Sequence, residues 1–287
     1  MYEPIRPILQ EIEFYWKYFA VQPEACPNHL YSNASEKETD IYVITFNNLF
    51  LVDYQIRTLR RFFQSPFNLI IVDNNNWLYP EQSKQVLQLC VDQGVTYLKA
   101  PDNFYQTEKT FFDPSMKLGT TMNWLYQQCA RVRKPKYFGY LDQDCFLVKD
   151  LDISGRLDRQ GMFGRAYRSK KIPEAWTLHV TTNFYRFDFV KDYELDFRAS
   201  YPYEMDTGGA NYDILYCRLN YEDYVIPMQA QRFDAADVNR PGSVQHYELL
   251  ADGEWYHMCA SSHDQLAGDG AYKLAYTKGY LDSRLQQ

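Results

Sequence analysis

The chain has 287 residues, a formal net charge of −7 and an aromatic content of 17%, with 26 tyrosines against 13 glycines. Its length fits one large or two modest domains with a full hydrophobic core, and its composition excludes a disordered, collagen-like or low-complexity chain. The acidic balance excludes a sequence-wide basic surface for nucleic acid.

Residues 1–39 are expected to form an N-terminal helix and loop, with the helix over 5–20. This segment lacks the small-residue cleavage site of a signal peptide, and no apolar run in the chain approaches the roughly 18 residues that span a membrane. The six cysteines are scattered without a C-x-x-C pair, which favours free thiols. We therefore expect a cytoplasmic protein without a transmembrane segment, and the aromatic N-terminal helix leaves peripheral association with the inner face of the membrane open.

Strand and helix patterns alternate four times over residues 40–150. Apolar, β-branched runs predict buried strands at 41–46, 68–73, 95–98 and 136–141. Apolar residues at helical spacing predict helices over 49–63 and 81–93, and a third that follows the capping residue Ser115. This alternation is typical of an α/β fold with an open, mostly parallel central sheet and flanking helices.

The rhythm changes over residues 151–287, which we interpret as the second half of the same compact domain. Its patterns predict a helix over 207–219 and short strands at 161–167, 179–187, 222–227 and 255–258. No linker or internal repeat separates the two halves, so we expect the second half to extend the same sheet.

Polar residues follow each of the first four predicted strands, where ligands of open parallel sheets bind. The four strand ends carry Thr45-Phe46-Asn47-Asn48, Asp73-Asn74-Asn75-Asn76, Pro101-Asp102-Asn103 and Asp142-Gln143-Asp144. None contains the G-x-G-x-x-G or G-K-[ST] pattern of phosphate-binding loops. The sequence therefore argues against a nicotinamide dehydrogenase and against a P-loop nucleotidase.

Asp142 and Asp144 directly follow the fourth apolar strand. Residues two apart on an extended chain point the same way, so both carboxylates can face one divalent cation. Carboxylate oxygens suit Mg²⁺ or Mn²⁺, and such a cation would offset the charge of a diphosphate without a basic cluster. We interpret the pair as a metal site, with a solvated strand end as the structural alternative.

Residues 40–150 resemble the nucleotide-binding half of a GT-A glycosyltransferase, particularly the bacterial family-two group. The matching segments are 41–47, 70–74 and 140–144. Two features depart from the family: Asn74-Asn75-Asn76 replaces the usual acid-glycine-serine turn, and the loop over 101–113 is long.

The resemblance implies a nucleotide diphosphate sugar as the donor, with a UDP-sugar as the default. Its nucleotide contacts would be Thr45, Asn47, Asp73 and Asn74. The resemblance makes Asp144 the direct metal ligand and places Asp142 near the ribose or the metal.

Residues 151–287 would then supply the acceptor side and a catalytic base. Asp206 and Glu204 precede the predicted helix, and an acid at this point deprotonates the acceptor hydroxyl in similar inverting enzymes. The structural alternative for Asp206 is a helix N-cap. The resemblance slightly favours an inverting mechanism, while no sequence feature excludes a retaining one.

Similar enzymes place a histidine in a C-terminal segment as a further metal or diphosphate ligand. His257 is our candidate and His263 is its competitor, because neutral imidazole is a sound ligand for Mn²⁺. Arg165 is a candidate contact of the diphosphate or the acceptor.

The sequence thus predicts a metal-dependent glycosyltransferase, of hexosyltransferase type, that moves a sugar to a hydroxyl of a glycan or lipid-linked acceptor in bacterial glycan or polysaccharide synthesis. Two alternatives stay open: a nucleotidyltransferase, and a non-catalytic carbohydrate- or nucleotide-binding module of the same fold. A phosphohydrolase with D-x-D-x-[TV] chemistry does not fit, because Phe146 stands at the fifth position.

Overall fold

The computed structural model of the chain describes residues 38–46, 48–74, 79–101, 114–233, 246–259 and 270–287. The helix expected over 5–20 lies outside these residues, as do the candidate site residues Asn47 and His263. The division into segments 1–39, 40–150 and 151–287 stays a prediction.

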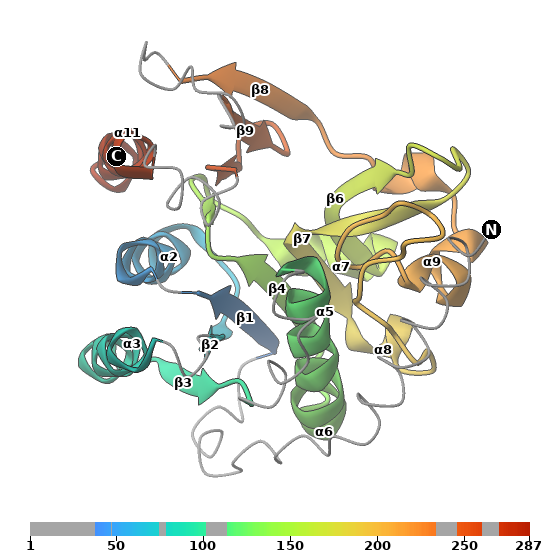
Figure 1. Cartoon of the computed structure of the whole chain (residues 1–287), viewed down its shortest axis with the longest axis horizontal. Coiled ribbons are helices and arrows are strands. Elements are labelled where there is room, and N and C mark those ends of the chain that lie inside the picture. The colour runs from blue at the N-terminus through green and yellow to red at the C-terminus, as the bar shows by residue number, and fades with distance from the viewer. Residues whose placement is uncertain (1–37, 47, 75–78, 102–113, 234–245, 260–269) are drawn as a thin grey trace, which may run out of the picture.

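A six-stranded mixed sheet forms the centre of the molecule (Figure 1). Its strands lie in the order β3-β2-β1-β4-β7-β6, with the bounds Thr96–Lys99, Phe67–Asp73, Thr39–Thr45, Tyr137–Asp142, Trp176–Arg186 and Met162–Arg168. The first four strands pair in parallel, whereas β7 runs antiparallel to both β4 and β6. The predicted α/β fold class, with an open and mostly parallel central sheet and flanking helices, is confirmed.

Helices pack against both faces of this sheet (Figure 1). Their bounds are Leu49–Phe62 for α2, Pro80–Gln93 for α3, Pro114–Leu125 for α5, Arg131–Arg133 for α6, Ile153–Gln160 for α7 and Phe187–Val190 for α8. Tyr42 and Ile44 of β1 belong to the core cluster of α5, while Ile41 and Val43 pack with α2 and α3. β1 is therefore buried on both faces, as its continuous apolar run predicts.

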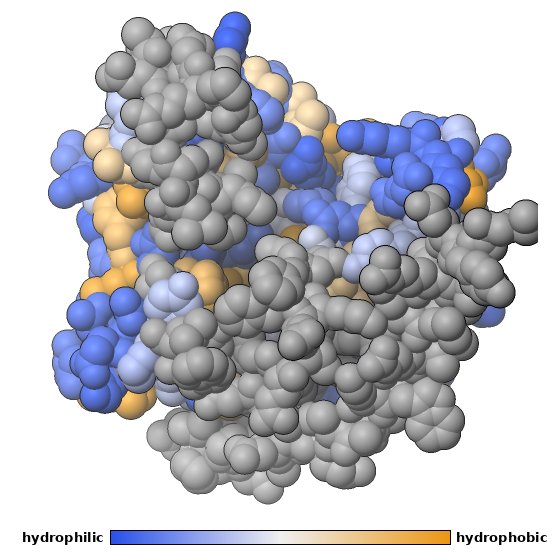
Figure 2. All heavy atoms as spheres, viewed as in Figure 1, coloured by the Kyte–Doolittle hydropathy of each residue, from blue (hydrophilic) through white to orange (hydrophobic). Residues whose placement is uncertain are grey.

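The α3 helix shows how the sheet is shielded from solvent. It buries Val86 and Cys90, and it ends at Gly94, whose φ of 60° gives the left-handed cap expected there. Figure 2 shows mostly hydrophilic residues at the lower left, where Figure 1 places this helix. The helix therefore separates the core from water with one apolar stripe.

A second, antiparallel sheet is built by four strands in the order β5-β10-β9-β8. Their bounds are Cys145–Leu147, Trp255–His257, His246–Leu250 and Met228–Arg232. The C-terminal helix α11, Gly270–Leu285, packs tyrosines against this sheet, among them Tyr280, whose ring stacks on that of Tyr256 at 4.6 Å. The expectation that the whole second half extends the central sheet is therefore wrong, since only β6 and β7 do so among the described strands.

The region after β7 also differs from the predicted elements. In place of a helix over 207–219, the chain forms turns, a four-residue helix α9, Asn211–Ile214, and a 3₁₀ turn, Tyr216–Arg218. Gly208, with a φ of 95°, breaks the helix pattern at its start. The strand expected at 222–227 is a 3₁₀ turn, Tyr221–Tyr224, because the rings of Tyr221 and Tyr224 pack on Trp176 instead of following a strand period.

Candidate active site

The Asp142-Gln143-Asp144 turn leaves β4 and leads directly into β5. The Gln143 side chain accepts a hydrogen bond of 2.8 Å from the backbone N–H of Phe46 at the end of β1. Gln55 of α2 donates to the carbonyl of Asp142 at 2.8 Å and to that of Cys145 at 2.7 Å. These bonds fix the turn between the two sheets, so the directions of its two carboxylates are set by the fold.

His257 reaches Asp144 through the pairing of β10 with β5. The register places His257 opposite Cys145, and the N–H of Met258 donates to the carbonyl of Asp144 at 2.9 Å. As a result, His257 Nε2 lies 3.4 Å from Asp144 Oδ1, and both residues are buried. The structure therefore brings together two of the three predicted metal ligands.

Asp142 lies beside this pair but is half-buried, and its Oδ1 accepts a hydrogen bond of 2.8 Å from the N–H of Gln143. Burial, followed by the neighbouring charge of Asp144, raises the pKa of Asp142 to about 7. The charge of Asp206 adds to this rise, so the predicted base lies within electrostatic reach of the predicted metal site.

Glu248 of β9 fixes the His257 ring from its other side. Its Oε2 lies 2.8 Å from His257 Nδ1, and Arg165 Nη1 lies 2.7 Å from the same oxygen. Burial alone would raise the pKa of Glu248, but the hydrogen bond from His257 and the charges of His257 and Arg165 lower it to about 2. Glu248 is therefore a carboxylate, and it holds the imidazole proton at Nδ1.

This arrangement leaves His257 Nε2 as the nitrogen that faces Asp144. Metal-binding histidines characteristically place their second nitrogen against a carboxylate in this way. The donor set of two aspartates and one imidazole fits Mn²⁺ or Mg²⁺. Sequence reasoning missed Glu248; the signal for it was a charged residue inside the apolar strand His-Tyr-Glu-Leu-Leu.

Arg165 is directed at Glu248 of the second sheet. It lies on β6 with a half-buried side chain, and its two terminal nitrogens bind Glu248 at 2.7 and 2.8 Å. Arg165 thus acts on His257 through Glu248, because its guanidinium neutralises the Glu248 carboxylate that orients the imidazole ring.

Three of the predicted nucleotide contacts, Thr45, Asp73 and Asn74, belong to the part of the chain that the structure describes; they lie at the ends of β1 and β2 and are bonded to neighbouring residues. Thr45 is 3.4 Å from the Gln143 oxygen. Asp73 accepts a hydrogen bond of 2.7 Å from the Tyr97 hydroxyl and lies 3.4 Å from the ammonium of Lys99. A further bond of 2.9 Å joins the Thr121 hydroxyl of α5 to Asn74. These side chains are buried, and their hydrogen bonds hold in place the strand ends beside which a ligand would bind.

Lys117 of α5 adds a cation beside these strand ends. Its ammonium lies 4.4 Å from the centre of the Phe46 ring. Burial, and then the charge of Lys99, lower the pKa of Lys117 to about 7. An anion at this place would stabilise the charged form of Lys117, and sequence analysis had not selected either lysine.

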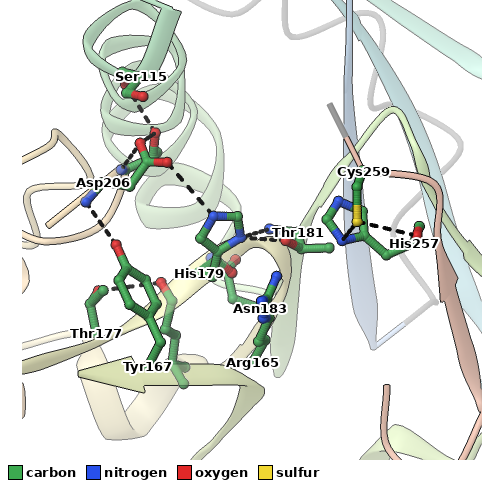
Figure 3. Close-up of polar contacts among 12 residues, drawn as sticks. Ser115, Arg165, Tyr167, Thr177, His179, Thr181, Asn183, Asp206, His257 and Cys259 are labelled. Carbon is green, nitrogen blue, oxygen red and sulfur yellow. Dashed lines mark hydrogen bonds and ion pairs between the residues drawn. The ribbon is translucent and has the colours of Figure 1, made fainter. Parts of the chain in front are cut away.

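Asp206 lies among the turns between α8 and α9 and not at a helix N-cap, which is Ala210 for α9. Its backbone N–H donates to the Tyr167 hydroxyl at 2.7 Å, and its carboxylate accepts from the N–H of Thr207 at 2.7 Å and from the Ser115 side chain (Figure 3). The second carboxylate oxygen lies 3.7 Å from His179 Nε2. Sequence reasoning found Asp206 but missed the residues that surround it.

These contacts make Asp206 a weak base. Burial would raise its pKa, but the hydrogen bond and charge of His179, with the bonds from Ser115 and Thr207, hold the pKa well below its usual range. The predicted partner Glu204 differs: it lies on an exposed turn with a φ of 48°, and its carboxylate is 3.9 Å from Lys171. The structure therefore does not bring Glu204 to the site.

His179 owes its position to a bulge in β7. Opposite the single residue Arg165 of β6, β7 carries the four residues 179–182. The backbone N–H of Thr181 donates to His179 Nδ1 at 3.2 Å, so the ring proton of a neutral imidazole lies on Nε2, toward Asp206 (Figure 3). Bulges commonly re-aim side chains next to functional sites.

Comparisons with known proteins give a fold-level likeness only. No protein-family model and no curated protein matches the chain. Three similar solved structures are the mannosyltransferase PcManGT from Pyrobaculum calidifontis in complex with GDP-Man and Mn²⁺ (12% identity, TM-score 0.35), the mannosyltransferase Ktr4p from S. cerevisiae (11%, 0.35) and TarS from S. aureus (16%, 0.34). The matches cover 63%, 59% and 54% of this chain, and 53%, 59% and 29% of the respective neighbours. At these values the likeness carries no argument about activity, substrate or cofactor.

In the part of the chain that the structure describes, no helix combines the length and the apolar character needed to cross a bilayer.

Proposed function

We propose that the protein is a metal-dependent glycosyltransferase that moves a sugar from a nucleotide diphosphate sugar to an acceptor hydroxyl. The observation that carries the proposal is the series of contacts from Asp144, which follows β4, to His257 of β10 and from there to Glu248 of β9. Two strands distant in sequence meet there to place an oriented imidazole 3.4 Å from a buried carboxylate. These residues meet at the carboxyl end of a parallel strand, and ligands of open α/β sheets bind at such strand ends.

Asp144 and His257 would hold the divalent cation, with Asp142 as the additional carboxylate. Bound there, Mn²⁺ or Mg²⁺ would offset the charge of the leaving diphosphate. Glu248 and Arg165 would contribute by keeping the Nε2 of His257 directed at the ion.

The nucleotide would lie over the ends of β1 to β3. Phe46 offers a ring, and the amino groups of Lys99 and Lys117 lie on this side of the sheet with the carboxylate of Asp73. Because burial and the charge of Lys99 lower the pKa of Lys117 to about 7, a bound anion would restore its full charge, which supports an anionic ligand in a protein that is acidic as a whole. UDP as the carrier rests on the family resemblance alone.

Asp206 would receive the acceptor. Its carboxylate is ionised, and Tyr167 and His179 fix the turn and the charge around it. We assign Asp206 the role of orienting the attacking hydroxyl and taking its proton, which suits an inverting transfer. A glycan or lipid-linked acceptor, a role in bacterial glycan or polysaccharide synthesis, and a cytoplasmic or peripheral inner-membrane location belong to the same proposal and rest on the sequence.

One observation favours a second candidate function. The strongly lowered pKa of Asp206 reduces its proton affinity, whereas an efficient general base has a pKa near the working pH. A non-catalytic nucleotide- or carbohydrate-binding module of the same fold would need no such base. It would bind a nucleotide sugar without turning it over.

The test is a thermal-shift screen of UDP-, GDP- and dTDP-sugars with and without Mn²⁺. We expect one nucleotide series to raise the melting temperature in the presence of Mn²⁺, and Asp144→Ala to abolish the rise. The control is Asp188→Asn, which removes an exposed carboxylate paired with Lys191 and should retain the full shift. The transferase proposal fails if no nucleotide stabilises the protein or if Asp144→Ala leaves the shift unchanged. Stabilisation without release of the nucleotide diphosphate in the presence of varied acceptors would favour the binding module.

A further inference from the structure

A second group of metal-ligating side chains lies on β9 and just after β10, next to His257. His246, Glu248 and Cys259 each offer one ligand atom, and these atoms all lie within 4.8 Å of one another. His246 Nε2 is 3.9 Å from Glu248 Oε1. Sequence analysis selected none of the three residues, and the glycosyltransferase proposal uses only Glu248, through its contact with His257.

Strand register explains why the three side chains converge. His246 and Glu248 are two residues apart on β9, so their side chains leave the same face of the strand. β9 pairs with β10 such that Glu248 stands opposite His257. Cys259 follows His257 by two residues, and its Sγ lies 3.3 Å from His257 Nδ1. Glu248 and Cys259 are buried, whereas the His246 side chain is 43% exposed and gives solvent ions access to the group.

The ligand chemistry of this group differs from that of the Asp144–His257 pair. Thiolate, imidazole and carboxylate together are a typical set for Zn²⁺, whereas Mg²⁺ and Mn²⁺ favour oxygen ligands. Zn²⁺ bond lengths of about 2.0–2.3 Å place the ligand atoms of one tetrahedron roughly 3.3–3.8 Å apart. The atoms here, all within 4.8 Å, would have to approach one another by about 1.5 Å or less.

We propose that His246, Glu248 and Cys259 form a second metal site, specific for Zn²⁺ and similar thiophilic cations. Binding releases the thiol proton of Cys259 to solvent and leaves the imidazole of His246 neutral. Three protein ligands leave a fourth position of the tetrahedron for water or another small ligand. The site does not depend on the proposed transferase activity.

Occupation of this site would act on the first one. Glu248 accepts hydrogen bonds from both His257 and Arg165, and a cation bound to its carboxylate competes with both donors. Lys273 donates to the carbonyl of Cys259 at 3.1 Å and adds a positive charge nearby. Zinc binding should therefore weaken Mn²⁺ binding at Asp144 and His257, which would make the second site inhibitory. This consequence, unlike the site itself, rests on the proposed function.

The test uses the full chain after treatment with a chelator, with Co²⁺ as a spectroscopic substitute for Zn²⁺. We expect thiolate-to-cobalt charge-transfer absorption in the near ultraviolet, one equivalent of Zn²⁺ to abolish it, and Cys259→Ser to eliminate it. His246→Gln should weaken Zn²⁺ binding more than about tenfold. Cys217→Ser, which removes an exposed thiol, and His179→Gln should leave the absorption and the affinity unchanged.

Two further measurements separate this site from the Asp144–His257 pair and from misfolding. Asp144→Asn should retain the thiolate absorption, and the melting temperature of chelator-treated Cys259→Ser should match that of the chelator-treated wild type. The proposal is overturned if the wild type shows no thiolate absorption, or if the absorption persists in Cys259→Ser. It is also overturned if Asp144→Asn removes the absorption while His246→Gln does not, because Cys259 would then belong to the first site.

Discussion

Two of the carboxylate–imidazole pairs in the described part of the chain have similar separations but different chemistry. Asp144 and His257 are 3.4 Å apart at the junction of the two sheets, and Asp206 and His179 are 3.7 Å apart at the bulge of β7. What distinguishes them is the group on the other nitrogen of each ring. Glu248 accepts at Nδ1 of His257, whereas a backbone N–H donates to Nδ1 of His179.

These partners decide what each imidazole can do. Burial lowers the pKa of His257, but the charge of Asp144 and the hydrogen bonds with Asp144, Cys259 and Glu248 raise it well above its ordinary value. Because Glu248 holds the Nδ1 proton, a cation has to displace only the Nε2 proton to gain a ligand nitrogen. In His179 the ring proton lies on Nε2 and points at Asp206, so this ring donates a hydrogen bond and offers no ligand atom in that direction. The first pair therefore suits the cation that we propose, and the second stabilises an ionised carboxylate.

The largest expected effect comes from removing the carboxylate of the second pair. Asp206→Asn should lower the rate of sugar transfer about 10³-fold, because the hydroxyl then lacks a proton acceptor in the transition state. The measurements are single-turnover transfer and donor binding by calorimetry. Donor affinity should stay within about twofold, as general-base loss acts on the chemical step alone. Full transfer by this variant would remove Asp206 from the mechanism.

Replacing the two histidines separately compares the pairs directly. His257→Ala should weaken Mn²⁺ binding at least about 100-fold, since it removes a ligand, while His179→Ala should change it less than about threefold. Isothermal titration with Mn²⁺ measures both. Equal losses in the two variants would contradict the distinction drawn between the pairs.

Glu248 tests the cause of that distinction. Glu248→Gln should weaken Mn²⁺ binding about tenfold, because the neutral amide holds the Nδ1 proton less firmly. Glu254→Gln is the matched control, since Glu254 also forms a part-buried ion pair with an arginine, Arg156, but does not contact His257. If both variants bind Mn²⁺ alike, Glu248 does not orient the ring.

The smallest effect concerns the stability of the second pair. The pKa of Asp206 lies below its value of 3.8 in an unfolded chain, so its ionised form stabilises the fold fully above about pH 4 and progressively less as the pH falls further. Because the pair is half-exposed, Asp206→Asn should lower the melting temperature by only about 2 °C at pH 6. This difference from the wild type should shrink toward pH 3 in thermal melts. A difference that grows on acidification would mean that the carboxylate is destabilising.

The first half of the fold follows from local pattern, because parallel strands buried on both faces need continuous apolar runs. The runs around Ile41 and Ile70 predict β1 and β2 to within two residues, and Gly94 ends α3 as expected. The prediction for the second half fails over 207–219 and over 222–227. There, aromatic residues such as Tyr216 and Tyr224 are fixed by packing on Trp176. The spacing of apolar residues along the sequence does not reveal a contact between segments this far apart.

The sequence by itself determined that Asp73, Asp142 and Asp144 lie at the carboxyl ends of parallel strands, because the alternation of strand and helix sets that edge of the sheet. Only the tertiary structure decided which side chains meet them. His257 reaches Asp144 through strand pairing between distant segments, and His179 reaches Asp206 through a bulge. Both events depend on register, where a shift of one residue turns a side chain to the opposite face.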